Sequence, residues 1–72
     1  MFDPVKFHRN LARTLRADEA NVRLAVTKAG GICGPVHRST RSGGGWSESL
    51  SILDGKGNSV DFVCLRAGKG LP

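Results

Sequence analysis

Hydrophobic residues in the first segment of the chain recur at the spacing of a helix. Phe7, Leu11 and Leu15 are four residues apart, so a helix would place them on one face. Asp3 precedes them and is a favourable N-cap, because its short carboxylate can accept the free backbone N–H groups of a first turn. The pattern predicts a helix over residues 3–16.

A second apolar stripe follows, and it allows two interpretations. Its members are Val22, Ala25, Val26 and Ala29. Asp18 can cap a helix at its start, and Gly30–Gly31 can end it, which predicts a helix over residues 18–29. Val22, Leu24 and Val26 also alternate as they would in a short strand, so residues 21–28 remain open between helix and strand.

Glycine, serine, threonine and valine dominate after Gly31, and helix-forming residues become rare. Such a composition favours strands joined by turns. The predicted strands are 36–41, which is polar and would lie at an edge, 46–53 and 59–66, followed by a tail at 67–72. The sequences "GGG" and "DGKGN" lie between them, and the second is typical of a hairpin turn.

Alternation along the last two predicted strands indicates which face would be buried. On strand 46–53 the inward residues would be Trp46, Leu50 and Ile52, with serines on the other side. On strand 59–66 they would be Val60, Phe62 and Cys64. We expect the helices to cover this face, with Cys64 as a small buried residue.

These elements predict a single domain of α+β class, with two N-terminal helices packed on a three-stranded antiparallel meander. A chain of 72 residues buries only a small core. It has no apolar run long enough to cross a membrane, and its first ten residues lack the apolar region of a signal peptide. We therefore expect a cytoplasmic protein with no membrane partner.

Positive charge is the strongest compositional signal. The chain has 11 Lys and Arg against 6 Asp and Glu, for a net charge of +5, which favours a polyanionic partner. Four of the cations would form a stripe on the face of helix 3–16 opposite Phe7. They are Lys6, Arg9, Arg13 and Arg16. The stripe could follow a row of phosphates, or it could be the solvated face of an amphipathic helix.

The segment "HRSTRSGGGW" is a second candidate binding site. Its candidate residues are His37, Arg38, Arg41 and Trp46. Arginines can bind phosphate through two hydrogen bonds, and a Trp can stack on a base. Alternatively, Trp46 anchors its strand, because it shares a face with Leu50 and Ile52. "GGG" is not followed by G-K-[ST] and a helix, so it does not predict a nucleotide-phosphate loop.

Metal and catalytic sites find little support. Cys33 and His37 have C-x3-H spacing, but His8 and Cys64 stand alone, whereas structural zinc normally uses two close ligand pairs. A thiolate pair of Cys33 with either histidine, or RNA cleavage by His37 beside arginines, has no local sequence signature. We assign no catalytic residue, metal or cofactor, and expect a protein that is not an enzyme.

The expected function is a small basic protein that binds DNA or RNA through phosphate contacts. The alternative is a compact inhibitor or adaptor, of the kind that phages and mobile elements encode, which docks on an acidic or nucleic-acid-binding surface of a larger protein. The edge strand 36–41 could take part in such pairing. A self-assembling subunit is a third possibility, because the sequence does not fix the oligomeric state. No small-molecule substrate is expected.

Overall fold

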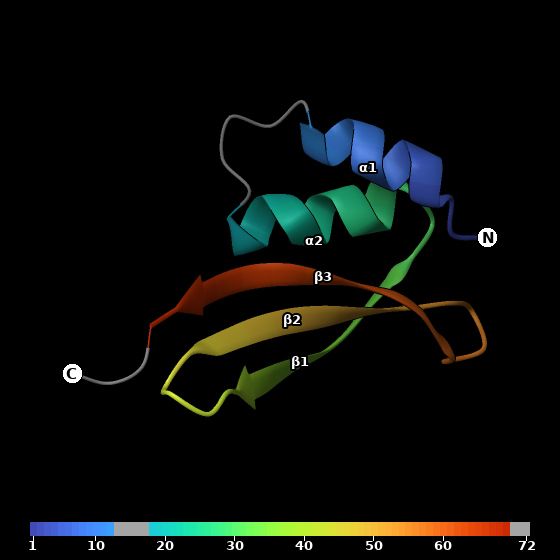
Figure 1. Cartoon of the computed structure of the whole chain (residues 1–72). Coiled ribbons are helices and arrows are strands. Elements are labelled where there is room, and N and C mark those ends of the chain that lie inside the picture. The colour runs from blue at the N-terminus through green and yellow to red at the C-terminus, as the bar shows by residue number, and fades with distance from the viewer. Residues whose placement is uncertain (13–17, 70–72) are drawn as a thin grey trace.

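The computed structural model describes residues 1–12 and 18–69 and contains two helices followed by three strands (Figure 1). These elements are α1 Pro4–Ala12, α2 Glu19–Lys28, β1 Ile32–Thr40, β2 Trp46–Leu53 and β3 Ser59–Gly68. The strands are antiparallel in the order β1-β2-β3, which makes β2 the central strand of a meander. The predicted α+β class and order of elements are confirmed.

Both helices lie on the same side of the sheet, and the other side carries no helix (Figure 1). We call these two sides the covered face and the bare face. The buried core lies between the helices and the covered face. It consists of Phe7, Val22, Ala25, Val26, Ala29, Leu50 and Ile52. The central strand therefore contributes both fully buried sheet residues, as the alternation of its sequence predicts.

α1 begins where its cap predicts. The Asp3 carboxylate accepts hydrogen bonds from the backbone N–H groups of Val5 at 3.0 Å and Lys6 at 3.1 Å. Phe7 is fully buried and packs on Phe2, with 5.7 Å between ring centroids. The prediction of helix 3–16 is confirmed over Pro4–Ala12, and its remaining residues, including Leu15, lie outside the described residues.

Residues 21–28 are helical and belong to α2, so the helix interpretation is confirmed and the strand interpretation is wrong. Asp18 is its N-cap and accepts a 2.9 Å hydrogen bond from the backbone N–H of Asn21. Val22 and Val26 are fully buried, whereas Leu24 is 52% exposed. The apolar residues therefore follow helical spacing, and the alternation that suggested a strand has no structural role.

β1 begins four residues earlier than the predicted strand 36–41. Its pairing with β2 is irregular between Cys33 and Val36, a stretch that contains Pro35. Proline lacks an N–H to donate, so it is tolerated at an edge strand or a bulge, and β1 provides both. The predicted edge position is confirmed.

The prediction for the inward face of β3 is wrong. Phe62 is 71% exposed and Val60 48% exposed, and Cys64 is exposed as well. Val63 lies opposite the buried Leu50 and packs against the core instead. Phe62 lies opposite a serine of β2, so it points to the bare face.

The physical reason for this error is that β3 carries apolar residues on both of its faces. Its sequence offers Val60, Phe62 and Cys64 in one alternation, and Val63 and Leu65 in the other. Two register shifts also interrupt its pairing with β2, at Val60 and at Leu65. A shift of one residue exchanges the two faces of a strand, so alternation alone cannot select the buried set.

Both connections in the meander are tight turns. In the predicted "DGKGN" turn, Asp54 N–H donates to Asn58 at 2.9 Å, which confirms the hairpin. In the β1–β2 turn, Arg41 N–H donates to the Gly45 carbonyl at 2.7 Å. Gly43 and Gly44 have φ angles of +96° and +93°, a region that other residues rarely adopt. The glycines are therefore required by the turn geometry.

Neither helix in the described part of the chain has the length and hydropathy needed to cross a bilayer.

Candidate nucleic-acid interface

The predicted stripe on the first helix is only partly described. Lys6 and Arg9 are exposed on α1, on the side away from the buried Phe7. Arg13 and Arg16 lie outside the described residues. The structure therefore tests neither the length of the stripe nor its continuity.

Two arginines elsewhere are neutralised by an arginine–glutamate network, made of Glu19, Arg23, Glu48 and Arg66. The Glu19 carboxylate accepts hydrogen bonds from Arg66 at 2.7 Å and from Arg23 at 3.0 Å. Arg66 also donates to Glu48. The hydrogen bonds from Arg66 and then Arg23 lower the pKa of Glu19 below 4.5. Glu48 first, and Glu19 second, raise the pKa of Arg66.

Trp46 and Arg38 form a cation–π pair at the end of the sheet. Arg38 lies opposite Glu48 and Thr40 lies opposite Trp46, so Arg38 and Trp46 are diagonal neighbours on the covered face. The Arg38 guanidinium carbon lies 4.4 Å from the indole centroid, within the range of a cation–π interaction. Trp46 is half-buried on the covered face, but it belongs neither to the core nor to the partly buried residues packed against it, so its predicted role as a core anchor stays a prediction.

The remaining two residues of this predicted site lie on the bare face. His37 is exposed and pairs with Ser49 in β2, on the face opposite to Arg38. Arg41 follows Thr40, which lies opposite Trp46 on the covered face, and its backbone N–H continues the pairing to the Gly45 carbonyl. Alternation therefore directs its side chain to the bare face, where its Cδ lies 3.8 Å from where a Cβ of Gly45 would be. The structure thus divides the predicted cluster between two faces of one sheet end.

The charges at this end of the sheet are unbalanced. In the part of the chain that the structure describes, neither Arg38 nor Arg41 forms an ion pair with a carboxylate. Glu48, the acidic residue opposite Arg38, is already bonded to Arg66. Positive charge at the β1–β2 turn is therefore available to an external anion.

Residues 1–12 and 18–69 contain no group of three His, Cys, Asp or Glu side chains that could hold a metal ion. Cys33 lies on the covered face, where its sulfur is 3.8 Å from the Arg23 carbonyl oxygen in α2. His37 points to the bare face, so the C-x3-H spacing does not bring these two side chains together.

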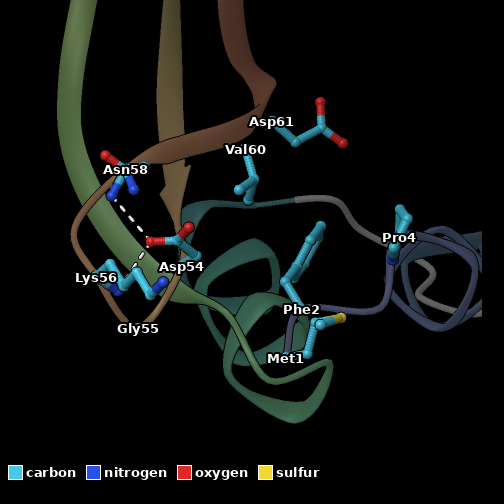
Figure 2. A pocket seen from close by; sticks show the side chains of 9 residues that line it. All are labelled: Met1, Phe2, Pro4, Asp54, Gly55, Lys56, Asn58, Val60 and Asp61. Atoms are coloured by element: carbon cyan, nitrogen blue, oxygen red, sulfur yellow. Dashed lines mark hydrogen bonds between the residues drawn. The ribbon is translucent and has the colours of Figure 1, made fainter.

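A pocket of about 660 Å³ lies at the opposite end of the sheet (Figure 2). Its lining residues are Met1, Phe2, Pro4, Asp54, Gly55, Lys56, Asn58, Val60 and Asp61. The Asp54 carboxylate accepts backbone hydrogen bonds from Asn58 at 2.9 Å and Lys56 at 2.8 Å, which lower its pKa, with that from Asn58 the larger cause. Asp61 accepts from Phe62 N–H and lies 4.0 Å from His8. Both acids of the pocket thus serve local structure.

No protein-family model, no curated protein and no solved structure matches this chain.

Sequence reasoning missed two features of the candidate interface. One is the pairing of Arg66 with Glu19, residues that are far apart in sequence. The other is the exposure of Phe62, which follows from the register of β3 with β2. The serines on one side of β2 were the available signal, because the cross-strand neighbours of a solvent-facing row also face solvent.

Proposed function

We propose that this chain is a small basic, non-enzymatic protein that binds nucleic acid through phosphate contacts at the end of its sheet. One observation carries the proposal. Arg38 and Arg41 have no carboxylate partner in the described structure, whereas Arg23 and Arg66 are neutralised by glutamates. Unneutralised arginines on a chain of net charge +5 favour a polyanion.

The cation–π contact prepares Arg38 for an anion. The Arg38 guanidinium carbon lies over the Trp46 ring, and this contact uses none of the guanidinium N–H groups, so they stay available for two hydrogen bonds to phosphate. Holding the side chain in place also reduces the rotamer entropy lost on binding. Trp46 acts here as the support of Arg38 and not as the residue that stacks on a base.

The test is a titration of labelled duplex and single-stranded oligonucleotides, followed by fluorescence anisotropy over a range of salt concentrations. Binding should weaken linearly on a log–log plot, because each neutralised phosphate releases counterions. The double variant Arg38→Ala, Arg41→Ala should reduce the magnitude of the slope by about 2. The control is Arg23→Ala, which removes an arginine that is already paired and should leave the slope unchanged.

Absence of binding to every oligonucleotide at low salt would overturn this function. The alternative would then be a protein-binding inhibitor or adaptor that presents the same cations to an acidic surface. β1 is an edge strand, which favours pairing with a partner strand. Binding of nucleic acid by the purified protein alone separates the two proposals.

A further inference from the structure

Among the Phe and Trp side chains that the structure describes, the one on the bare face of the sheet is the most exposed. Phe62 is 71% exposed, while Phe7 is fully buried and Phe2 and Trp46 are half-buried. Leaving a Phe side chain in water forgoes the free energy that burying it in a core would release. This ring is therefore a feature that the fold alone does not explain.

The surroundings of Phe62 leave both its ring and the neighbouring sheet surface accessible. Ser51 of β2 lies directly opposite, and Ser49 lies opposite Cys64, two residues along β3. Serine side chains are too short to cover a phenyl ring from the next strand. On the bare face the ring thus lies beside the serine row of β2, with Leu53 and the exposed Ile32 beyond Ser51. Both helices are on the other side of the sheet (Figure 1).

The described residues of the three strands place no acid on the bare face. Their only acids are Glu48, bonded to Arg66, and Asp61, which lies opposite the buried Ile52 and 4.0 Å from His8 of α1. Both positions belong to the covered face. The bare face instead carries the imidazole of His37 and, at the turn, the guanidinium of Arg41.

An exposed ring on a sheet face that carries no acid and has a guanidinium at its far end is complementary to single-stranded nucleic acid. Every base offers a π-face to an aromatic side chain, and the backbone offers phosphates to the cations. A second copy of the chain is a poorer occupant, because the apolar residues of the bare face (Phe62, Leu53 and Ile32) lie at one end of the serine row, and the Arg41 guanidinium groups of two copies would repel each other. A duplex hides its base faces by stacking, so it could use the cations but not the ring.

We propose that the bare face binds single-stranded nucleic acid, with a base stacked on Phe62 and phosphates held by Arg41 and His37. This inference rests on the proposed function and adds the class of nucleic acid and the residue that contacts a base. Ser51, beside Phe62, and Gly45, beside Arg41, are six residues apart. That separation is about 20 Å along an extended strand, so the site would span several nucleotides.

The experiment compares three ligands of equal length: a single strand, the same strand with abasic positions, and the duplex. DNA and RNA versions of the single strand form separate arms. Each is titrated against the wild-type protein, Phe62→Leu and the control Leu24→Ala, which shortens an exposed apolar residue on α2. Phe62→Leu keeps an apolar side chain and removes the π-face, and its exposed position should preserve folding.

We expect the single strand to bind more tightly than the abasic strand. Phe62→Leu should weaken binding of the single strand by about 5- to 150-fold, the equivalent of ~1–3 kcal/mol for one stacked base. The salt slope should not change, because no phosphate contact is removed. Leu24→Ala should bind the single strand as tightly as wild type does. Phe62→Leu should bind the abasic strand as tightly as wild type does.

A direct reporter complements the affinities. In a Trp46→Phe background, Phe62→Trp places the only Trp of the chain on the bare face. Quenching of its fluorescence by the single strand but not by the duplex is the expected result. Unquenched fluorescence at saturating single strand would overturn the stacking contact.

The two proposals fail in different ways. Equal affinity of wild type and Phe62→Leu for the single strand, with a normal salt slope, overturns the base platform and leaves phosphate binding intact. No binding of any ligand at low salt overturns both proposals. A wild-type dimer in sedimentation that Phe62→Leu converts to a monomer assigns the bare face to a second copy and also overturns the platform.

Discussion

At the scale of the residue, the pair of Trp46 and Gly68 shows how closely the sheet end is packed. A Cβ added to Gly68 would lie 2.7 Å from the indole Nε1 and 2.8 Å from Cε2 and Cζ2. Real Cβ atoms do not approach other atoms this closely, so only glycine fits here. Arg38 lies over the same ring. Because Gly68 has no Cβ, the indole can stay in place and hold this arginine, which is a candidate for binding phosphate.

Gly68→Ala should therefore displace the indole. We expect a loss of about 1–3 kcal/mol in the free energy of unfolding, typical of overpacking, together with a changed Trp46 emission spectrum. Urea denaturation followed by fluorescence measures both. The matched control is Gly55→Ala, where a new Cβ meets nothing within 4 Å. An unchanged spectrum and midpoint for Gly68→Ala would contradict the close approach.

At the scale of the element, the arginine–glutamate network ties the start of α2 to β2 and β3. Glu19 belongs to α2, Arg66 to β3 and Glu48 to β2, so three elements share one set of hydrogen bonds. The residues are partly exposed, and exposed ion pairs stabilise proteins only slightly. Their main role is to hold α2 in its place over the sheet and to neutralise two arginines.

The network predicts a loss of stability in acid. The folded-state pKa of Glu19 is lowered, so its contribution is complete above the unfolded value of 4.5 and is lost as the pH falls through the lowered pKa. Glu19→Gln should be less stable than wild type at neutral pH, with a gap that closes in acid. Urea midpoints across this pH range provide the measurement. Asp54→Asn removes the other acid with a lowered pKa and serves as the comparison.

Alternation predicts β2 correctly and β3 incorrectly, for a reason visible in their residues. In β2 every second residue from Ser47 to Ser51 is a serine, so only one face can be buried. In β3 Phe62 and Val63 are adjacent and both apolar, and the choice between them depends on pairing with β2. Pairing is a contact between distant segments, and bulges shift it, so local sequence does not contain it.

Local sequence predicts the candidate binding residues but not the long-range contacts that they make. Local charge and the single Trp indicate eight candidate residues. The six that the structure describes are the exposed Lys6, Arg9, His37, Arg38 and Arg41 together with the half-buried Trp46. Their division between faces follows from strand alternation once β1 is known to continue through His37. The neutralisation of Arg66 requires three elements to meet, which no short-range pattern encodes.

Paired substitutions test the face assignment. Leu50→Ala should cost about 2–5 kcal/mol, because it opens a cavity in a fully buried position. Phe62→Ala removes a larger side chain but should change stability by less than about 0.5 kcal/mol, because the ring faces solvent. Urea denaturation of both variants decides the matter. A cost for Phe62→Ala comparable to that of Leu50→Ala would place the ring in the core.

At the scale of the whole molecule, one small core holds the two layers together. Its residues come from α1, α2 and β2, so neither the helices nor the sheet has an apolar interior of its own. The candidate interface lies at the β1–β2 turn and the pocket at the β2–β3 turn, with the core residues Leu50 and Ile52 of β2 between them. The described elements should therefore form one cooperative unit.

Cooperativity can be measured with the single Trp. Trp46 emission reports on one end of the sheet, while far-ultraviolet circular dichroism reports mainly on the helices. Thermal and urea unfolding curves from the two signals should coincide if the layers unfold together. Separate midpoints would show that the sheet end loosens before the helices, and the single-unit description would be wrong.

The central place of β2 has a consequence for proton exchange with deuterated water. Each backbone amide of β2 faces either β1 or β3, whereas in β1 and β3 every second amide points away from the sheet. Slow exchange should therefore run without interruption along β2 and alternate residue by residue along its two neighbours, apart from the bulges. Heteronuclear NMR spectra of the free protein in deuterated water would therefore reveal the strand order from this alternation of exchange rates. A partner strand bound at either edge would slow the exposed amides of that edge strand, and the alternation would disappear there.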